Sequence, residues 1–139
     1  MLILDTDHLT AIDRATASGA SLRRRLASQE DDFCTTVVSI SEQLSGLLAL
    51  ISSAKSDHEI VDRYERLFRK LGALHDFRVL AWTEAAAAEF HQLRRRKLRI
   101  GTMDLRIACI ALTHDATLLS RNLRDFQRVP GLRVEDWLS

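Results

Sequence analysis

Residues 101–126, GTMDLRIACIALTHDATLLSRNLRDF, decide the fold of this chain because they combine a buried helix, a short strand and a polar turn. Almost every position from Met103 to Leu112 is apolar or small, which predicts a helix that is buried on most of its surface. Leu118 and Leu119 predict a short strand. The polar turn after it stands where strands of open α/β sheets deliver functional groups.

Two acids of this stretch, Asp104 and Asp125, stand at the ends of predicted elements. Asp104 lies in the first turn of the predicted helix, in line with Ala108 and Ala111. It therefore points along a face of small residues, which another element can approach closely. A carboxylate on such a face requires an explanation, and we expect both acids to meet others from upstream in the chain.

The composition is that of a soluble globular protein with one domain. Of the 139 residues, 46% are hydrophobic and 28% are charged, and this length allows a sizeable core. The formal net charge is +1, which gives no general electrostatic argument for nucleic-acid binding. A function of that kind has to rest on local clusters of charge.

Cysteine usage and the N-terminal sequence predict a cytoplasmic protein. Cys34 and Cys109 lie in apolar surroundings and form no CxxC pair, so we expect two reduced core residues, with a disulfide between them as the alternative. The first residues, MLILD, lack the basic region of an export signal. No apolar run approaches the length needed to cross a bilayer.

Short apolar runs alternate with helical patterns along the whole chain. The pattern predicts strands at Leu2–Leu4, Phe33–Val38, Arg78–Trp82, Leu118–Leu119 and, after the turn Pro130-Gly131, at Leu132–Val134. Such an alternation is typical of an α/β domain with a mainly parallel sheet covered by helices on both faces.

Helix boundaries follow from cap and break residues. A Ser-Gly-Ala-Ser break at Ser18–Ser21 predicts that a helix begins only after it, and Gly72 predicts the end of the helix opened by Ser56. Apolar residues at helical spacing in Ile40–Ile51 and Ile60–Leu74 are expected to be mostly core, although these helices could also leave a groove for a partner helix or a dimer contact.

Four acids follow strands or open the next helix: Asp5, Glu42, Asp104 and Asp125. These ends lie along one edge of a parallel sheet, so the acids can converge there. Two carboxylates about 5 Å apart repel by roughly 3 kcal/mol at an effective dielectric near 20. A divalent cation would remove this repulsion, and oxygen ligands without Cys or His favour Mg²⁺ or Mn²⁺ over zinc. Such an ion suits water activation at a phosphodiester.

Each acid also has a structural interpretation. Glu42 and Asp125 both fit the last position of a capping box, in Ser39–Glu42 and Asn122–Asp125. Asp104 could favour the positive end of its helix, and Asp5 could be a turn residue. Four independent caps, however, would have no reason to fall at corresponding ends of successive units, so jointly the four acids favour a site.

The segments LILDTDHL, SISEQL, GTMDLRIACIAL and LLSRNLRDF together resemble PIN-domain proteins of the VapC toxin type. The resemblance runs nearly from end to end and implies a single PIN domain over residues 1–139 with a three-layer α/β/α fold. It implies a Mg²⁺- or Mn²⁺-dependent endoribonuclease that hydrolyses RNA and is inhibited by a VapB-type antitoxin encoded beside it. Homodimers are common among such proteins, so we expect one here.

The same resemblance assigns residues by position. Asp5, Glu42, Asp104 and Asp125 match the acidic metal site. We predict that Asp5, Asp104 and Asp125 hold the ion, directly or through water, and that Glu42 helps to orient or deprotonate the attacking water. Asn122 matches a supporting polar residue, and Ser120 stands where many members have Thr. Asp7 departs from the commoner Asn or Ser, which leaves open whether it supports the site or caps a helix. We expect the three metal ligands to lie within reach of one ion.

A basic run precedes the Asp104 helix and consists of Arg94, Arg95, Arg96, Lys97 and Arg99. It could receive an RNA backbone, or its cations could simply complete the C-terminal end of a helix. Of the five histidines none has metal-ligand spacing, and only His8 is next to a predicted site residue, Asp7.

Two other functions compete with ribonuclease activity. Asp5-Thr6-Asp7 resembles the DxD motif of haloacid-dehalogenase-type phosphatases, in which the first Asp is the nucleophile. That family also needs a placed lysine, and Lys55, Lys70 and Lys97 stand in no convincing setting. A non-catalytic binding module with the same fold is the second alternative, and the presence of all four acids argues against it.

Overall fold

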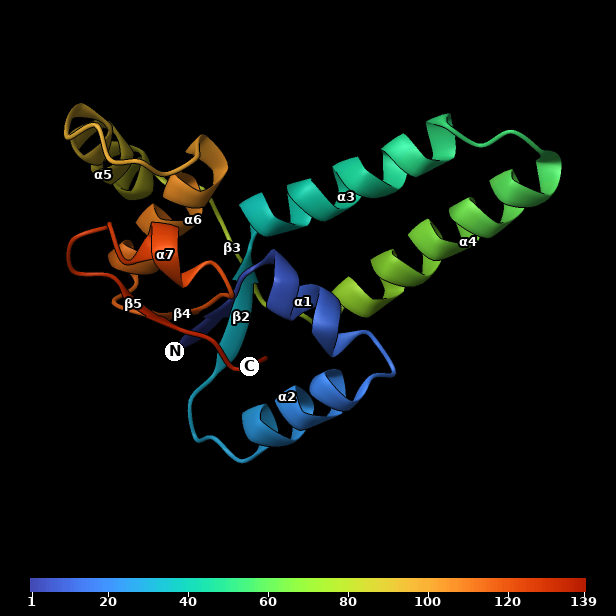
Figure 1. The fold of residues 1–139 in the computed structure, drawn as a ribbon, viewed down its shortest axis with the longest axis horizontal. Coiled ribbons are helices and arrows are strands. Elements are labelled where there is room, and N and C mark those ends of the chain that lie inside the picture. Colours follow the sequence, from blue (N-terminus) through green and yellow to red (C-terminus); the bar gives the residue numbers. More distant parts are fainter.

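A computed structural model describes all 139 residues and contains one five-stranded parallel sheet (Figure 1). The strand order is β3-β2-β1-β4-β5, and every neighbouring pair is parallel. The strands are β1 (Leu2–Leu4), β2 (Phe33–Thr36), β3 (Val79–Leu80), β4 (Thr117–Leu119) and β5 (Arg133–Glu135). The predicted α/β class and parallel sheet are confirmed.

Seven helices connect and cover these strands. They are α1 (Thr6–Ile12), α2 (Ala17–Ala27), α3 (Val37–Ser52), α4 (Asp57–Leu74), α5 (Glu84–Arg95), α6 (Thr102–Thr113) and α7 (Leu123–Phe126). Figure 1 shows α5, α6 and α7 on one side of the sheet and α1 and α2 on the other. None of the seven combines the length and apolar character that a membrane crossing requires.

Alternation along the strands divides the core into two parts. Ile3 pairs with Cys34 and Leu118 and contributes to the larger apolar cluster, which includes residues of α5 and α6. Leu2 and Leu4 belong to the smaller cluster, with residues of α1 and α2. Successive side chains of a strand point to opposite faces, so one three-residue strand serves both layers. Both cysteines are free and buried, as predicted.

The predicted break at Ser18–Ser21 is wrong, because α2 already begins at Ala17. Thr16 caps this helix by accepting a hydrogen bond from the Gly19 amide. A Cβ atom at Gly19 would lie only 2.4 Å from the carbonyl oxygen of Ala11. The glycine therefore permits close packing of α2 against the end of α1 and does not interrupt the helix.

Other boundaries also differ from the prediction, and the third strand is only Val79–Leu80 rather than Arg78–Trp82. The second strand ends at Thr36, whose hydroxyl accepts a hydrogen bond from the Ser39 amide and so caps α3. Gly72 does not end α4, which continues to Leu74. A single glycine costs a helix about 1 kcal/mol, and the neighbouring turns of α4 continue the helix through it.

Helices α3 and α4 form an antiparallel pair, the arm, that extends away from the sheet (Figure 1). The expectation that their apolar residues are mostly core is wrong for both helices, because α4 has no buried residue and none of the residues Ile40–Ile51 of α3 is buried. Val61 and Phe68 keep 69% and 72% of their surface exposed. Lys70 forms an ion pair of 2.7 Å with Asp13, which ties the far helix of the arm to the end of α1.

The C-terminal residues are anchored on His8 of α1. Its imidazole is fully buried, and its Nε2 accepts a hydrogen bond of 3.1 Å from the Trp137 amide. Protonation of Nε2 would place a hydrogen against the Trp137 amide hydrogen and break this bond. Burial lowers the pKa of His8 to about 4, although the charges of Asp136 and Asp7 act in the opposite direction.

We predict that His8 makes stability fall in acid. Between about pH 6.5 and 4 the unfolded chain protonates this histidine and the folded chain does not, so the free energy of unfolding decreases by up to about 3 kcal/mol as the pH falls. A His8→Gln variant keeps an acceptor for Trp137 but does not titrate. Urea unfolding of both proteins across this range should show that the wild type loses stability relative to His8→Gln as the pH falls. Parallel curves would contradict the assignment.

Candidate active site

The carboxyl ends of β1 and β4 define the site. Strand β1 lies between β2 and β4 in the sheet. The chain leaves β1 towards β2 on one side, while β4 flanks β1 on the other, and a crevice forms where the connections that follow β1 and β4 diverge. Asp5 follows β1 directly, and Ser120 follows β4. The Asp5 amide donates to the Leu119 carbonyl at 2.9 Å, which fixes these two strand ends side by side.

Asp5 is the most buried acid of the site, with 6% of its surface exposed. Its Oδ1 accepts from the Thr6 amide and its Oδ2 accepts from the Ser120 hydroxyl, both at 2.7 Å. The first bond makes Asp5 the N-cap of α1, so the structural interpretation of this residue is correct as far as it goes. Burial raises the pKa of Asp5 although these hydrogen bonds oppose the shift.

Asn122 joins the two acids of the C-terminal stretch. Its Nδ2 donates to Asp104 at 3.0 Å and to Asp125 at 3.1 Å, while its backbone amide donates to the Ser120 hydroxyl at 3.0 Å. It makes no side-chain cap to α7, which excludes the capping-box interpretation there. A chain of hydrogen bonds therefore runs from Asp5 through Ser120 and Asn122 to both distal acids.

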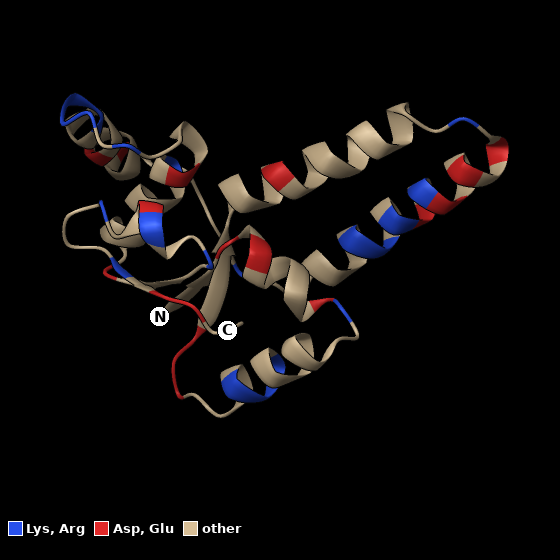
Figure 2. Cartoon of the chain, in the orientation of Figure 1, with Lys and Arg blue, Asp and Glu red and all other residues tan.

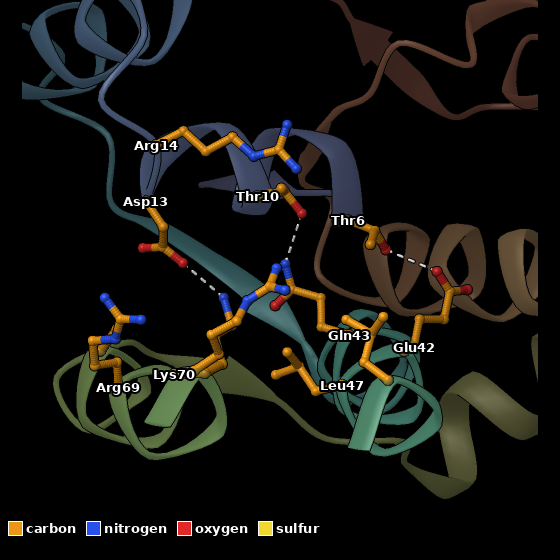
Figure 3. Close-up of a pocket in the computed structure, with 13 residues that line it drawn as sticks. Thr6, Thr10, Asp13, Arg14, Glu42, Gln43, Leu47, Arg69 and Lys70 are labelled. Carbon is orange, nitrogen blue, oxygen red and sulfur yellow. Dashed lines mark hydrogen bonds and ion pairs between the residues drawn. The ribbon is translucent and has the colours of Figure 1, made fainter. Parts of the chain in front are cut away.

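Glu42 reaches the site from α3. Its Oε2 accepts from the Thr6 hydroxyl at 2.9 Å, a contact visible in Figure 3. The capping-box interpretation of Glu42 is wrong, because Thr36 rather than Ser39 caps α3. Thr6 was not predicted as a site residue. Its only sequence signal is its place directly after the strand-end Asp5.

Mutual repulsion is evident at Asp104. The pKa of this carboxyl is raised to about 6, first by burial and then by the charge of Asp5, with smaller contributions from Glu42 and Asp125. The hydrogen bond from Asn122 acts in the opposite direction. The other three acids thus all lie close enough to influence Asp104, in agreement with their convergence at one edge of the sheet.

Arg128 compensates part of this charge and was not predicted. Arg128 lies in the turn after α7, and its Nη1 is 3.0 Å from Oδ1 of Asp125, three residues earlier in α7. The i,i+3 spacing of an acid and an arginine is the signal that the sequence offered. Asp125 thereby uses one oxygen for Arg128 and the other for Asn122.

The acids are not preorganised as metal ligands, because no three His, Cys, Asp or Glu residues are arranged to hold a metal ion. Asn122 lies between Asp104 and Asp125 and holds them with its amide hydrogens. The chemistry of the donors nevertheless fits a hard divalent cation. The acids offer only oxygen atoms, and a cation would relieve the repulsion that raises the pKa of Asp104.

The other predicted residues lie around the site. Asp7 is exposed in the first turn of α1, and its charge raises the pKa of Asp5. The basic run stands at the end of α5 and in the loop after it, where Figure 2 shows a concentration of positive charge. Its members Arg94 and Arg95 occupy the last turn of α5, as the helix-end interpretation requires. Lys70 is engaged by Asp13, so this lysine does not support a phosphatase site.

The chain matches the PIN domain family over residues 2–132. Ribonuclease VapC2 of Rickettsia felis is 41% identical over 46 residues, which cover 33% of this chain and only 34% of that protein. The tRNA(fMet)-specific endonuclease VapC of Shigella flexneri is 28% identical over 126 residues, which cover 85% of each chain. A crystal structure of DNA-bound VapBC from Salmonella typhimurium has a TM-score of 0.75 at 26% identity, over 98% of this chain and 97% of that chain.

We predict that Asp104→Asn stabilises the metal-free protein near neutral pH. Ionised Asp104 is unfavourable in the folded state because its pKa is raised to about 6, so removing the charge should raise the free energy of unfolding. Allowing for solvent screening, we expect about 1–2 kcal/mol. The advantage should shrink as the pH falls through about 6, where the wild-type carboxyl takes up its proton.

Urea unfolding in the presence of a chelator measures this difference. Asp62→Asn is the matched control, because Asp62 is exposed on α4 and forms no ion pair. Equal stabilities of wild type and Asp104→Asn at neutral pH would show that the pKa of Asp104 is not raised in the folded protein.

Proposed function

The chain belongs to the PIN-domain family, and we propose that it is a metal-dependent endoribonuclease and the toxin of a VapBC-type toxin–antitoxin pair. The observation that carries this proposal is the raised pKa of Asp104 in a crevice where four acids meet. Such a crevice attracts a divalent cation, and with it a phosphodiester. The names of the relatives, ribonuclease and endonuclease, agree with this activity.

We assign Asp5, Asp104 and Asp125 as the residues that would hold Mg²⁺ or Mn²⁺. The bound ion supplies neutralisation of the phosphate charge and activation of a water molecule. Glu42 keeps Oε1 free, since only Oε2 is bonded to Thr6, and this oxygen takes the proton of the attacking water. Ser120 and Asn122 position Asp5, Asp104 and Asp125 through the hydrogen bonds described above.

Asp5→Asn and Asp104→Asn should each lower RNA cleavage by about 100-fold or more, since each removes a charge required at the reacting centre. Asparagine caps a helix as well as aspartate does, so Asp5→Asn keeps the start of α1. Cleavage of labelled RNA with added Mg²⁺ or with a chelator measures the effect.

Asp62→Asn again serves as the control and should cleave like the wild type. Near-normal, chelator-resistant cleavage by both site variants would exclude the proposed chemistry. A stable phosphoryl group trapped on Asp5 would instead support the phosphatase alternative.

A cavity of about 670 Å³ lies between α1 and the arm and is the proposed seat of the antitoxin (Figure 3). Thr6 and Glu42 line its inner end, so an occupant of this groove would cover the acid site. The predicted groove on the helices of the arm is therefore present. Solved VapBC complexes resemble this chain over nearly its full length, which supports a partner of the VapB type.

The lining defines the chemistry of this partner segment. Leu47 and Leu50 offer apolar contacts, whereas Arg14, Arg66 and Arg69 supply positive charge. Arg14 and Arg66 form no ion pair within the chain, and Arg69 has only a long one, of 3.9 Å, with an exposed glutamate one turn earlier on α4. A segment that carries both apolar and acidic side chains would satisfy the groove.

Gly46→Gln should weaken antitoxin binding about tenfold or more, because a loss of about 1.4 kcal/mol in binding energy is tenfold in affinity. Gly46 lines the groove, and a Cβ atom there would meet nothing within 4 Å, so the added side chain would fill the groove without disturbing the chain. Isothermal titration with the purified antitoxin measures the affinity.

Gly72→Gln is the matched control. Gly72 lies in a helix of the same arm and is equally open, but it does not line the groove. Both variants should gain about 0.5–1 kcal/mol of stability from the replacement of a helical glycine. Equal affinities of the two variants for the antitoxin would place the partner elsewhere.

We also propose a homodimer, and the apolar stripe of α4 is the surface that favours it. Val61, Tyr64 and Phe68 follow one another at helical spacing, and each is more than half exposed. The basic run at the end of α5 is proposed to receive the RNA backbone, since its side chains are mostly exposed.

A further inference from the structure

A second cavity, of about 550 Å³, lies on the opposite side of α3 from the cavity between α1 and the arm that is proposed to hold the antitoxin. Its floor is formed by Phe90 and Val38, which are almost fully buried. Trp82 stands edge-to-face against Phe90 with the ring centroids 5.8 Å apart, and it remains 37% exposed. The cavity thus presents a rigidly packed aromatic surface that is still open to solvent.

Cations surround this aromatic surface without any acid. The guanidinium groups of Arg94 and Arg106 lie 5.7 Å and 5.6 Å from the centre of the Phe90 ring. Neither arginine forms an ion pair, and no Asp or Glu lines the cavity. Two arginines beside one aromatic ring, with no anionic partner, indicate a site for a ligand with negative charge.

The cavity adjoins the acid site through two shared helices. On α3, Ser41 lines the cavity and the next residue is Glu42. On α6, Met103 lines the cavity and the next residue is Asp104. Helices α3 and α6 are in contact, so the cavity and the acids Glu42 and Asp104 share one pair of packed helices.

We propose that this cavity binds one unpaired base of single-stranded RNA, which stacks on Trp82 while Arg94 and Arg106 bind its phosphate. The inference rests on the proposed ribonuclease function and names a subsite for its substrate. Aromatic side chains combined with cations are the usual means of holding single-stranded nucleic acid. A pocket of this volume is also within the range of small-ligand sites.

A second copy of the chain is the other candidate occupant, and charge argues against it. A two-fold interface places the same surface patch of both subunits together, so Arg94 and Arg106 would face the arginines of the other copy without an acid to pair with. Like charges in an interface are unfavourable. An RNA strand has the opposite charge.

Trp82 can report on its own occupancy because the chain has only two tryptophans. In a Trp137→Phe variant Trp82 is the sole source of tryptophan fluorescence. A 2′-O-methyl oligoribonucleotide, added with a chelator, cannot be cleaved. We expect it to quench this fluorescence in a saturable manner, as a base stacked on the indole ring does.

Three variants test affinity, measured by fluorescence anisotropy of the labelled oligonucleotide. Trp82→Leu keeps an apolar side chain but removes the stacking surface, and we expect about tenfold or more weaker binding. Arg94→Gln should also weaken binding, whereas Arg24→Gln removes the same charge from an exposed residue of α2, outside the cavity and the basic run, and should have little effect. Thermal unfolding of each variant establishes that it is folded.

Cleavage of labelled RNA is measured in parallel, so that the two proposals fail separately. Metal-dependent cleavage without quenching of Trp82, and with equal binding by Trp82→Leu, would overturn the base site and leave the ribonuclease function intact. Quenching without any cleavage would support the subsite and contradict the ribonuclease function. If Trp82→Leu converted a dimer to monomer in sedimentation while binding RNA normally, the cavity would belong to a subunit interface and the inference would be overturned.

Discussion

Electrostatic repulsion among carboxylates is the constraint on which the site depends. Asp5, Glu42, Asp104 and Asp125 come from four different segments, and the parallel sheet brings them to one edge. Neutral donors hold all four in place: Ser120 holds Asp5, Thr6 holds Glu42, and Asn122 holds Asp104 and Asp125. These hydrogen bonds orient the acids but do not neutralise them, and burial together with the charges of the other three acids raises the pKa of Asp104.

The core supplies the rigidity that this arrangement requires. Ile3 fills one layer while Leu2 and Leu4 fill the other, so the strand that ends at Asp5 is fixed from both faces. Helix α6 presents the buried residues Ala108 and Ala111 on the face that carries Asp104. Small side chains there let the helix approach the sheet closely. The side chains that bring the acids together are thus the same ones that stabilise the fold.

Sequence reasoning found the strands and the acids because both leave local signals. Acids followed the short apolar runs or opened the next helix, and the order of these runs predicted a parallel sheet whose edge would collect them. It could not find Thr6, since a single hydroxyl after a strand has many uses and its bond to Glu42 joins residues 36 positions apart. The start of α2 was misplaced because Gly19 resembles a break in sequence, and only its distance to Ala11 shows otherwise. The resemblance indicated Asn122, but its shared bond to two acids depends on tertiary geometry.

The arm has a consequence for how proteins of this fold diversify. Helix α4 buries none of its residues and is held mainly by its contact with α3 and by the ion pair of Lys70 with Asp13. Substitutions on its surface therefore cost the core little, because the sheet and its two apolar clusters do not depend on them. The same helix lines the groove beside Glu42. With the antitoxin in the proposed groove, substitutions in the arm can change which antitoxin binds while the acids stay unchanged. Related toxin–antitoxin pairs in one cell can thus avoid binding one another's partners without any change in their shared chemistry.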